Sequence, residues 1–459
     1  MSKTGLPVLI IGAGTGGLAL AHGLKKAGIP VEVYERDRHR AGGLQGYRVG
    51  ISPNGVRSLR DCLPAELFDT FVATTARDYE YFSMFTERLR PLLTMTARDL
   101  ACPEQGVIRD YSVSRMTLRQ VLLTGLEDIV RFDKTFSHYE SDGDTVTAHF
   151  EDCSSATGCL LVGADGANSR TRKQYLPHAT HTETGLVAIG GKQAITEDNT
   201  DLLPGQARHG LSMITDKRST FGIVHVMEFP WQGNREIKDG IGTSDAELIK
   251  RWPGLLFDNT TDYFSWGVSA SREVLPDRVN DMTGEELQQL VLRDLVYDWH
   301  PNLLALIRHS DPSTTFALNI RTSDPVDPWR PSRITLLGDA VHTMTPGRGA
   351  GANTALRDAR LRSRPNTFRS NSLVDRMRGG EAGDRTFRAD HRKVGVWRRT
   401  LRPHRVDTQA TPGQPLLSGS DDVHPAAIAP PIAPGRPPHQ RHQAPPSGHI
   451  RLSTSEAIW

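Results

Sequence analysis

The chain has 459 residues, enough to bury a large hydrophobic core and to form two domains. Its 55 Lys and Arg nearly balance its 53 Asp and Glu, and the net charge of +2 gives no electrostatic basis for nucleic-acid binding. Four cysteines without a C-x-x-C pair, no signal-peptide pattern and no apolar stretch of membrane-spanning length predict a reduced, cytoplasmic protein.

The segment from residue 8 to residue 36 has the pattern of a strand–turn–helix–strand unit. Four apolar residues, Val8–Ile11, lead into the turn G-A-G-T-G-G at residues 12–17. An apolar-periodic helix follows, and a second strand ends at Glu35. The length and order match one βαβ unit of a dinucleotide-binding fold.

Each element of this turn has a predicted task. Gly12 permits the tight turn, Gly14 lets the backbone approach a pyrophosphate, and Gly17 lets the helix lie close on the sheet. The helix N-terminus offers N–H groups to phosphates, and Glu35 can accept hydrogen bonds from ribose hydroxyls. A carboxylate there would repel a 2′-phosphate, which favours FAD or NAD over NADP. The alternative is a glycine-rich turn in another kind of α/β protein.

More elements are predicted up to residue 162. A helix is expected from Ser114, its N-cap, to Leu126. The remaining predictions are the strands Val49–Ser52, Tyr79–Thr86, Phe132–Tyr139, Thr145–Phe150 and Cys159–Val162 and the helix Val56–Cys62. The last strand ends at Gly163-Ala164-Asp165-Gly166, a second glycine and aspartate turn.

From about residue 181 the pattern is that of an antiparallel sheet. Thr283-Gly284-Glu285-Glu286 is a capping box that opens a helix predicted from Leu287 to about His300. A short parallel-type strand, Arg333–Leu337, ends at a third turn, Gly338-Asp339. The other predicted strands are Gly185–Ile195, Gly210–Thr215, Phe221–Phe229, Tyr263–Ser269 and Thr314–Arg321.

This order predicts an α/β protein with a discontinuous Rossmann-like domain, at 1–180 and 323–360. A mostly antiparallel β-sheet domain, 181–322, is inserted between these segments and is expected to bind the substrate. Residues 361–459 hold 12 of the 29 prolines and carry 16 Lys and Arg against 8 Asp and Glu. This composition predicts a basic, Pro/Arg/His-rich and largely disordered C-terminal tail.

Three turns thus follow three predicted parallel strands. Ligands of open α/β sheets bind beyond the carboxyl ends of the strands. We therefore expect one extended ligand, held along its length by the turns at 12–17, 163–166 and 338–339.

The combination of G-x-G-x-x-G, G-A-D-G-x-x-S at 163–169, G-D-A-x-H at 338–342 and G-x-G-x-N at 349–353 is specific. It resembles the single-component FAD-dependent aromatic hydroxylases, the para-hydroxybenzoate hydroxylase-like and salicylate hydroxylase-like flavin monooxygenases, over residues 7 to about 360. Gln45–Arg48 and Val113–Arg115 look closest to members that act in secondary metabolism. The resemblance implies FAD as cofactor, NAD(P)H as a transient co-substrate, and hydroxylation or epoxidation of a small aromatic or polyketide-like metabolite with O₂.

The resemblance also implies a role for single residues. Glu35 would hold the ribose, Arg48 would lie against the cofactor, and Arg115 would reach its ribityl–pyrophosphate region. Asp339 would bind the same region through its side chain and backbone, and Asp165 belongs to a turn associated with FAD and the nicotinamide nucleotide. The residues expected to bring backbone N–H groups to the flavin ring are Gly349, Gly351, Ala352 and Asn353.

Each assignment has an alternative. Arg48 and Arg115 could form surface ion pairs, while Asp165 and Asp339 could satisfy the backbone of their own turns. His342 fits a structural histidine at a helix start. The pattern assigns no catalytic residue, metal ligand or oligomeric state. An FAD-dependent reductase or dehydrogenase of the same fold, or a catalytically dead flavoprotein, is the alternative function.

Overall fold

The computed structural model describes residues 5–40, 48–100, 110–218, 220–230, 262–327, 329–330, 332–345 and 349–363. The tail predicted at 361–459 lies outside the described residues from position 364 onward. The same holds for residues 45–47 of the segment that ends at Arg48. No helix in the described ranges is both long and apolar enough to span a membrane.

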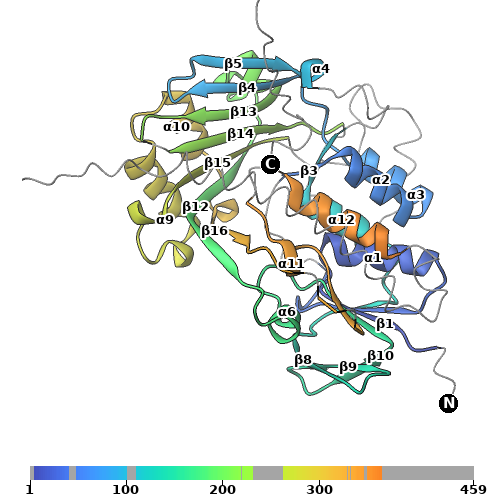
Figure 1. The fold of residues 1–459 in the computed structure, drawn as a ribbon. Helices are drawn as coiled ribbons and strands as arrows, with labels where there is room; N and C mark the ends of the chain where they lie inside the picture. The colour runs from blue at the N-terminus through green and yellow to red at the C-terminus, as the bar shows by residue number, and fades with distance from the viewer. Residues whose placement is uncertain are drawn as a thin grey trace, which may run out of the picture. The chain divides into compact units, whose positions relative to one another are not determined.

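A five-stranded parallel sheet forms the predicted nucleotide-binding part (Figure 1). Its strand order is β17-β11-β1-β2-β7, and every neighbouring pair is parallel. The strands are β1 (Val8–Ile11), β2 (Val31–Tyr34), β7 (Val130–Arg131), β11 (Leu160–Gly163) and β17 (Ile334–Leu336). The predicted Rossmann-like sheet is confirmed.

Alternation along β1 explains how both faces of this sheet are covered. Val8 and Ile10 join a core with helices, whereas Leu9 and Ile11 join a core with a small second sheet. The helices are α1 (Thr15–Lys26), α2 (Pro53–Cys62), α3 (Ala65–Ala73), α5 (Arg115–Leu123) and α12 (Ala350–Arg362). The small sheet consists of β8 (Phe136–Ser141), β9 (Val146–Phe150) and β10 (Ser155–Gly158).

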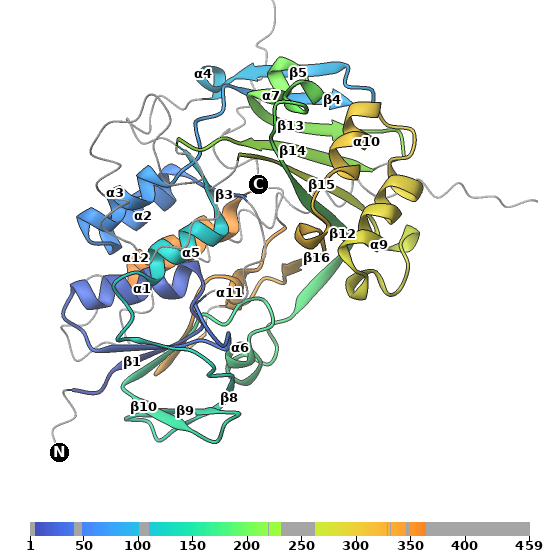
Figure 2. The ribbon, with the colours of Figure 1, turned by 180° about the vertical axis from the view of Figure 1, so that it is seen from behind.

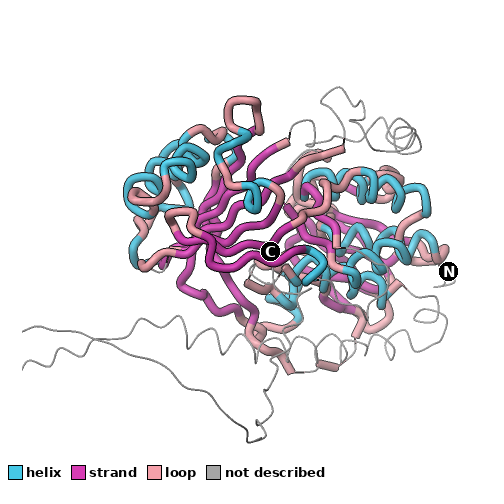
Figure 3. Tube along the Cα trace, turned by 90° about the horizontal axis from the view of Figure 1, so that it is seen from above, coloured by secondary structure: helices cyan, strands magenta, loops and turns pink. Residues whose placement is uncertain are grey.

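A seven-stranded sheet has the order β16-β12-β15-β14-β13-β4-β5. It is antiparallel except for the parallel pair β13–β4. α9 (Gly284–Leu290), a π-helical turn (Val291–Leu295) and α10 (Pro301–Arg308) pack on one face (Figure 3). The strands are β4 (Tyr81–Thr86), β5 (Pro91–Thr96), β12 (His181–Ala194), β13 (Gly210–Thr215), β14 (Phe221–Met227), β15 (Tyr263–Ser271) and β16 (Phe316–Ser323).

The remaining elements are short. β3 (Arg48–Ile51) and β6 (Tyr111–Ser114) form an antiparallel pair. The other helices are α4 (Ala97–Leu100), α6 (Arg170–Tyr175), α7 (Gly205–Arg208) and α11 (Asp339–His342), with 3₁₀ turns at Thr200–Leu202, Arg272–Val274, Val279–Asp281 and Pro312–Thr314.

Two predictions need correction. The helix expected to reach about His300 ends at Leu295, where Val296 leaves the helical conformation, and a separate helix, α10, begins at Pro301 with His300 as N-cap. Ser114 does precede α5, but its side chain makes no capping hydrogen bond. The capping box of Thr283 and Glu286 is confirmed.

The division of the chain into domains stays a prediction. Strand pairing nevertheless adds a detail that the sequence order did not indicate. β4 and β5 belong to the stretch 1–180, yet they pair at the edge of the seven-stranded sheet through β13. This sheet is therefore assembled from two separate stretches of the chain.

Candidate functional site

The three predicted turns lie at the ends of neighbouring parallel strands. β1, β11 and β17 are adjacent in the sheet, so the turns that follow them meet at one edge. A Cβ atom on Gly12 would lie 2.4 Å from the carbonyl oxygen of Ala164, and one on Gly16 would lie 2.3 Å from Leu337 Cδ2. The structure thus brings together turns separated by more than 140 residues along the chain.

The glycines of the first turn are present for different physical reasons. Gly12 has φ +105°, and a Cβ on Gly17 would lie 2.3 Å from the Gly12 carbonyl oxygen. Packing within the chain therefore excludes side chains at both positions. Gly14 has φ −82°, which any residue adopts, and no atom of the described residues lies within 4 Å of a Cβ placed there. Packing among the described residues therefore does not require glycine at position 14, which leaves room for a ligand.

The open space beside Gly14 lies at the start of a helix. Gly14 is the N-cap of α1, and the first helical turn holds no acidic residue that would neutralise its positive end. The first N–H groups of a helix have no partner inside the helix. A phosphate fits such a surface, because it needs donors and tolerates no side chain in between.

Glu35 is buried directly beside this turn. Its Oε2 accepts the Ala13 N–H at 2.6 Å, and its Oε1 accepts the Asp37 N–H at 3.0 Å. Arg119 Nη2 lies 3.8 Å from Glu35 Oε2 and 2.8 Å from Asp37 Oδ2. A carboxylate has about four acceptor positions. The acid is therefore fixed in place and keeps acceptor capacity for hydroxyl groups.

Arg115 and Asp339 form the middle of the site. Both side chains are exposed to solvent, yet loss of hydration raises the pKa of Asp339 and lowers the pKa of Arg115. Each charge partly opposes the shift of the other. A Cβ on Gly351 would lie 3.7 Å from Asp339 Oδ1, so the start of α12 borders the same place.

The start of α12 is held by Asn353. Its side-chain oxygen accepts the Ser52 N–H at 2.9 Å, and its NH₂ group donates to the carbonyl oxygens of Gly50 and Gly349 at 2.9 and 2.8 Å. Gly349, the N-cap, has φ +58°. The Asn353 side chain therefore joins the loop after β3 to α12, which leaves backbone N–H groups of 349–353 as the groups able to face a ligand.

Asp165 serves its own turn, as the alternative interpretation held. Its Oδ1 accepts the hydroxyl of Ser169 at 2.5 Å, and its Oδ2 accepts the N–H and the hydroxyl of Thr171, both at 3.1 Å. This side chain orders the start of α6. These three bonds use most of the acceptor capacity of the Asp165 carboxylate.

His342 also has a structural partner. Its Nε2 lies 2.7 Å from Oδ2 of Asp358, a buried residue that sequence reasoning did not single out. Burial raises the pKa of Asp358, but the charges of His342 and Arg362 outweigh burial and hold it well below its usual range. The pair links α11 to α12 behind the third turn.

Arg48 is half-buried. Its Nε donates to Ser112 Oγ at 3.0 Å, and burial lowers its pKa to about 10 against the opposing charges of Tyr79, Asp110 and Tyr263. Burial raises the pKa of Asp110 to about 6, although Arg48 opposes this shift. Sequence reasoning missed Asp110, because a lone Asp in a loop carries no pattern.

Arg48 lies where the nucleotide-binding part meets the seven-stranded sheet. Burial, together with the Arg48 charge, holds the pKa of His225 on β14 well below its usual value. Within the described ranges, His225 Nδ1 and Asp110 Oδ1 are enclosed atoms without a hydrogen-bond partner. Two enclosed polar atoms without a hydrogen-bond partner beside one half-buried cation indicate a place for a polar ligand group.

The sheet face that carries His225 is mostly apolar. The register places Phe82, Leu211 and His225 side by side on β4, β13 and β14. An apolar cluster of buried and half-buried residues continues along this face: Phe82, Leu211, Ile223, Met84, Met95 and Met213. Flat, sulfur-rich surfaces of this kind suit aromatic ligands.

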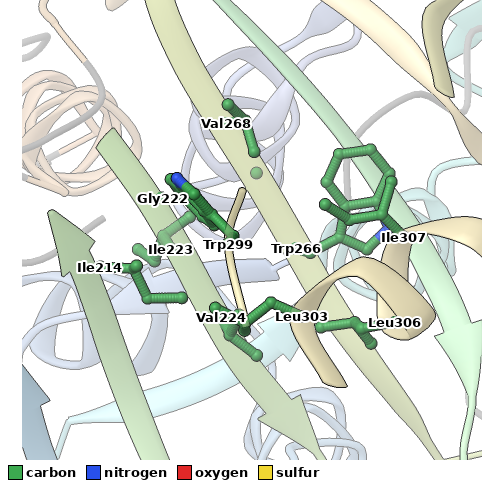
Figure 4. A pocket seen from close by; sticks show the side chains of 11 residues that line it. Ile214, Gly222, Ile223, Val224, Trp266, Val268, Trp299, Leu303, Leu306 and Ile307 are labelled. Atoms are coloured by element: carbon green, nitrogen blue, oxygen red, sulfur yellow. The ribbon is translucent and has the colours of Figure 1, made fainter. Parts of the chain in front are cut away.

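The opposite face of this sheet holds a small apolar cavity against α10 (Figure 4). Val224, Trp266, Trp299, Leu303 and Leu306 are among its lining residues. Its volume of about 10 Å³ is at most that of a single water. This cavity is a packing defect of the core and lies apart from the three turns.

Comparison with known proteins agrees with this geometry. A family model described as "FAD binding domain" matches residues 5–362. The dual O-methyltransferase/FAD-dependent monooxygenase elcB of Phaeosphaeria nodorum is 32% identical over 376 residues, covering 77% of this chain and 39% of that protein. The chain therefore spans about two fifths of the length of this dual protein. The FAD-dependent monooxygenase dbaB of Emericella nidulans is 31% identical over 390 residues, which cover 78% of this chain and 86% of dbaB.

Solved structures show the same architecture. A putative FAD-containing monooxygenase from Photorhabdus luminescens is 32% identical with a TM-score of 0.69, covering 86% of this chain and 97% of that one. HpxO of Klebsiella pneumoniae, solved with FAD and uric acid, is 23% identical with a TM-score of 0.62 and covers 87% and 93% of the two chains. The likeness to HpxO shows the fold alone.

Proposed function

Since the chain belongs to the FAD-binding domain family over residues 5–362, we propose that it is an FAD-dependent monooxygenase. It would use NAD(P)H and O₂ to hydroxylate or epoxidise a small aromatic or polyketide-like metabolite of secondary metabolism. The observation that carries the proposal is the meeting of three turns along one edge of a parallel sheet.

The described residues fit FAD along its length. Glu35 would accept the ribose hydroxyls, and the N–H groups after Gly14 would bind the pyrophosphate. Asp339 and Arg115, two accessible groups of opposite charge, would contact the ribityl and phosphate region beside the start of α12. Backbone groups of 349–353 would support the ring.

When bound, FAD accepts a hydride from NAD(P)H and activates O₂ for transfer of one oxygen atom. The chain would position the substrate and exclude water. The apolar face of the seven-stranded sheet would receive the ring system of the substrate. Asp110 and His225, each with one unpartnered atom, would bind its polar substituents beside Arg48.

The names of the relatives support the proposed type of reaction. The names of elcB and dbaB describe monooxygenases, and the first also carries a methyltransferase activity that acts on oxygen. An oxygen-methylating partner domain is consistent with hydroxylated metabolites. In the same proposal, 1–180 and 323–360 bind FAD, 181–322 with β4 and β5 holds the substrate, and the protein acts in the cytoplasm.

A sequence of three measurements tests the proposal. Purified protein should show flavin absorption bands or gain them when FAD is added. A panel of phenolic and polyketide-like aromatics should then include compounds that accelerate NAD(P)H oxidation. With ¹⁸O₂, the product should contain one labelled oxygen atom. A product without label would indicate the reductase or dehydrogenase alternative, and protein that never binds FAD would indicate the dead flavoprotein.

A further inference from the structure

The small sheet of β8, β9 and β10 has one covered and one open face (Figures 1 and 2). Phe136, Val146, Ala148 and Phe150 point into the core shared with the five-stranded sheet. Residues on the opposite face are turned away from that core, because side chains alternate along a strand. Whatever the open face binds is separate from the three turns.

A β-bulge changes which residues reach the open face. The register pairs Phe136 with Phe150 and His138 with His149, so β8 advances by two residues where β9 advances by one. Ser137 is the extra residue. Without the bulge, His138 would face the core like Phe136. With it, His138 stands opposite His149 on the open face, and Glu140 follows two residues later on the same side.

These three side chains are arranged as ligands of one ion. The imidazole rings of His138 and His149 are stacked, with centroids 4.6 Å apart and planes 10° apart. One ligand atom from each of His138, Glu140 and His149 lies within 4.8 Å of the other two. His149 Nε2 is 3.6 Å from Glu140 Oε2. Two ligand atoms on a tetrahedral zinc ion are about 3.3 Å apart, given bonds of about 2.0 Å.

The hydrogen bonding around the cluster is incomplete without an ion. His149 Nε2 is enclosed and has no hydrogen-bond partner in the described part of the chain, because 3.6 Å to Glu140 is too long. His138 Nδ1 lies 3.2 Å from Ser137 Oγ. That contact engages one ring nitrogen and leaves Nε2 as the ligand atom, as outer contacts commonly do for metal-binding histidines.

We propose that His138, Glu140 and His149 bind a divalent zinc ion. Two imidazole nitrogens and one carboxylate oxygen suit Zn²⁺, with water completing the tetrahedron. The ion would join β8 to β9 across the open face. Sequence spacing gave no metal pattern, because the ligands come from two strands and meet only through the bulge. The alternative is an ordinary histidine–glutamate contact without an ion.

The test measures zinc binding to the full chain, without FAD and without an added histidine tag. Titration calorimetry with ZnCl₂ compares the parent with His138→Gln and His149→Gln, and His178→Gln is the control because His178 is exposed outside the cluster. Each cluster variant should weaken one binding event at least tenfold or remove one equivalent of zinc. The control should bind like the parent.

Cobalt provides an independent readout. Co²⁺ bound to two imidazoles and a carboxylate in a four-coordinate site absorbs strongly in the visible range, and this band should vanish in the double variant His138→Gln/His149→Gln. Circular dichroism identical to that of the parent shows that the double variant is folded. A double variant that binds as much zinc as the parent, with the same affinity and the same cobalt band, would overturn the proposal.

Discussion

Gly14→Ala should separate ligand binding from folding. At this position the backbone is in an ordinary extended conformation, and the added methyl group would have no described neighbour within 4 Å. The apo-protein should therefore fold normally. The methyl group would project into the space that we assign to the pyrophosphate, and FAD affinity should fall.

The expected changes in the free energy of unfolding and in FAD affinity follow from the surroundings of residue 14 without and with the cofactor. Alanine is a poorer N-cap than glycine, but it also reduces the conformational freedom of the unfolded chain, so the free energy of unfolding should change by less than about 1 kcal/mol. An extra methyl group in a filled contact costs about 1–3 kcal/mol. Because 1.4 kcal/mol is tenfold, the Kd for FAD should rise roughly 5- to 150-fold.

Gly17→Ala is the matched control within the same turn. Its Cβ would lie 2.3 Å from the Gly12 carbonyl oxygen, which is backbone and cannot move freely. This variant should lose stability even without FAD. The assays are urea unfolding of both apo-proteins and quenching of FAD fluorescence. The assignment of the space beside Gly14 to the pyrophosphate would be refuted by either of two results. One is that Gly14→Ala binds FAD like the parent, and the other is that it loses as much stability as Gly17→Ala.

Three further predictions rest on other contacts. Glu35→Gln should raise the Kd for FAD about 10- to 100-fold in the fluorescence assay, since a hydrogen bond to a charged group contributes about 1.5–3 kcal/mol. Asn353→Ala loses three hydrogen bonds and should lower the free energy of unfolding by about 2–4 kcal/mol in urea. His22 donates a hydrogen bond to the Leu122 carbonyl oxygen, and burial lowers the pKa of His22 to about 4. Between pH 6.5 and 4 the unfolded chain therefore binds more protons than the folded chain. The free energy of unfolding should fall by about 3 kcal/mol as the pH drops through that window. His22→Gln should lack that part of the pH dependence in unfolding measured from pH 7 to 4.

Local pattern was enough to predict the parallel sheet and most of its helices. β1 and β11 are runs of consecutive buried residues, and such runs between turn signals are typical of strands covered on both faces. β5 was missed because Leu92 and Leu93 are exposed and adjacent, which gives no alternation. The pairing of β4 with β13 could not be predicted either, because a parallel pair between distant segments produces no local sequence pattern.

The candidate site was predictable where it depends on glycine spacing and on strand ends. Gly12, Gly14 and Glu35 occupy places that the βαβ pattern specifies residue by residue. Asp110 and Asp358 were missed for a different reason. Their pKa shifts come from burial and from charges brought by other segments, and burial of one loop residue is decided by the whole fold.

The contacts between the nucleotide-binding part and the seven-stranded sheet also limit where a substrate can react. Asn353 fixes the start of α12 to Gly50 on β3, the strand that carries Arg48. Arg48 in turn interacts with Tyr263 and His225 of the seven-stranded sheet. These contacts therefore connect the end of the proposed FAD groove to the sheet face that carries His225 and not to the face beneath α10, where the cavity of about 10 Å³ is far too small for an aromatic ring. A substrate oxidised by this protein should consequently lie against His225, and replacing His225 should change substrate affinity while leaving FAD affinity unchanged.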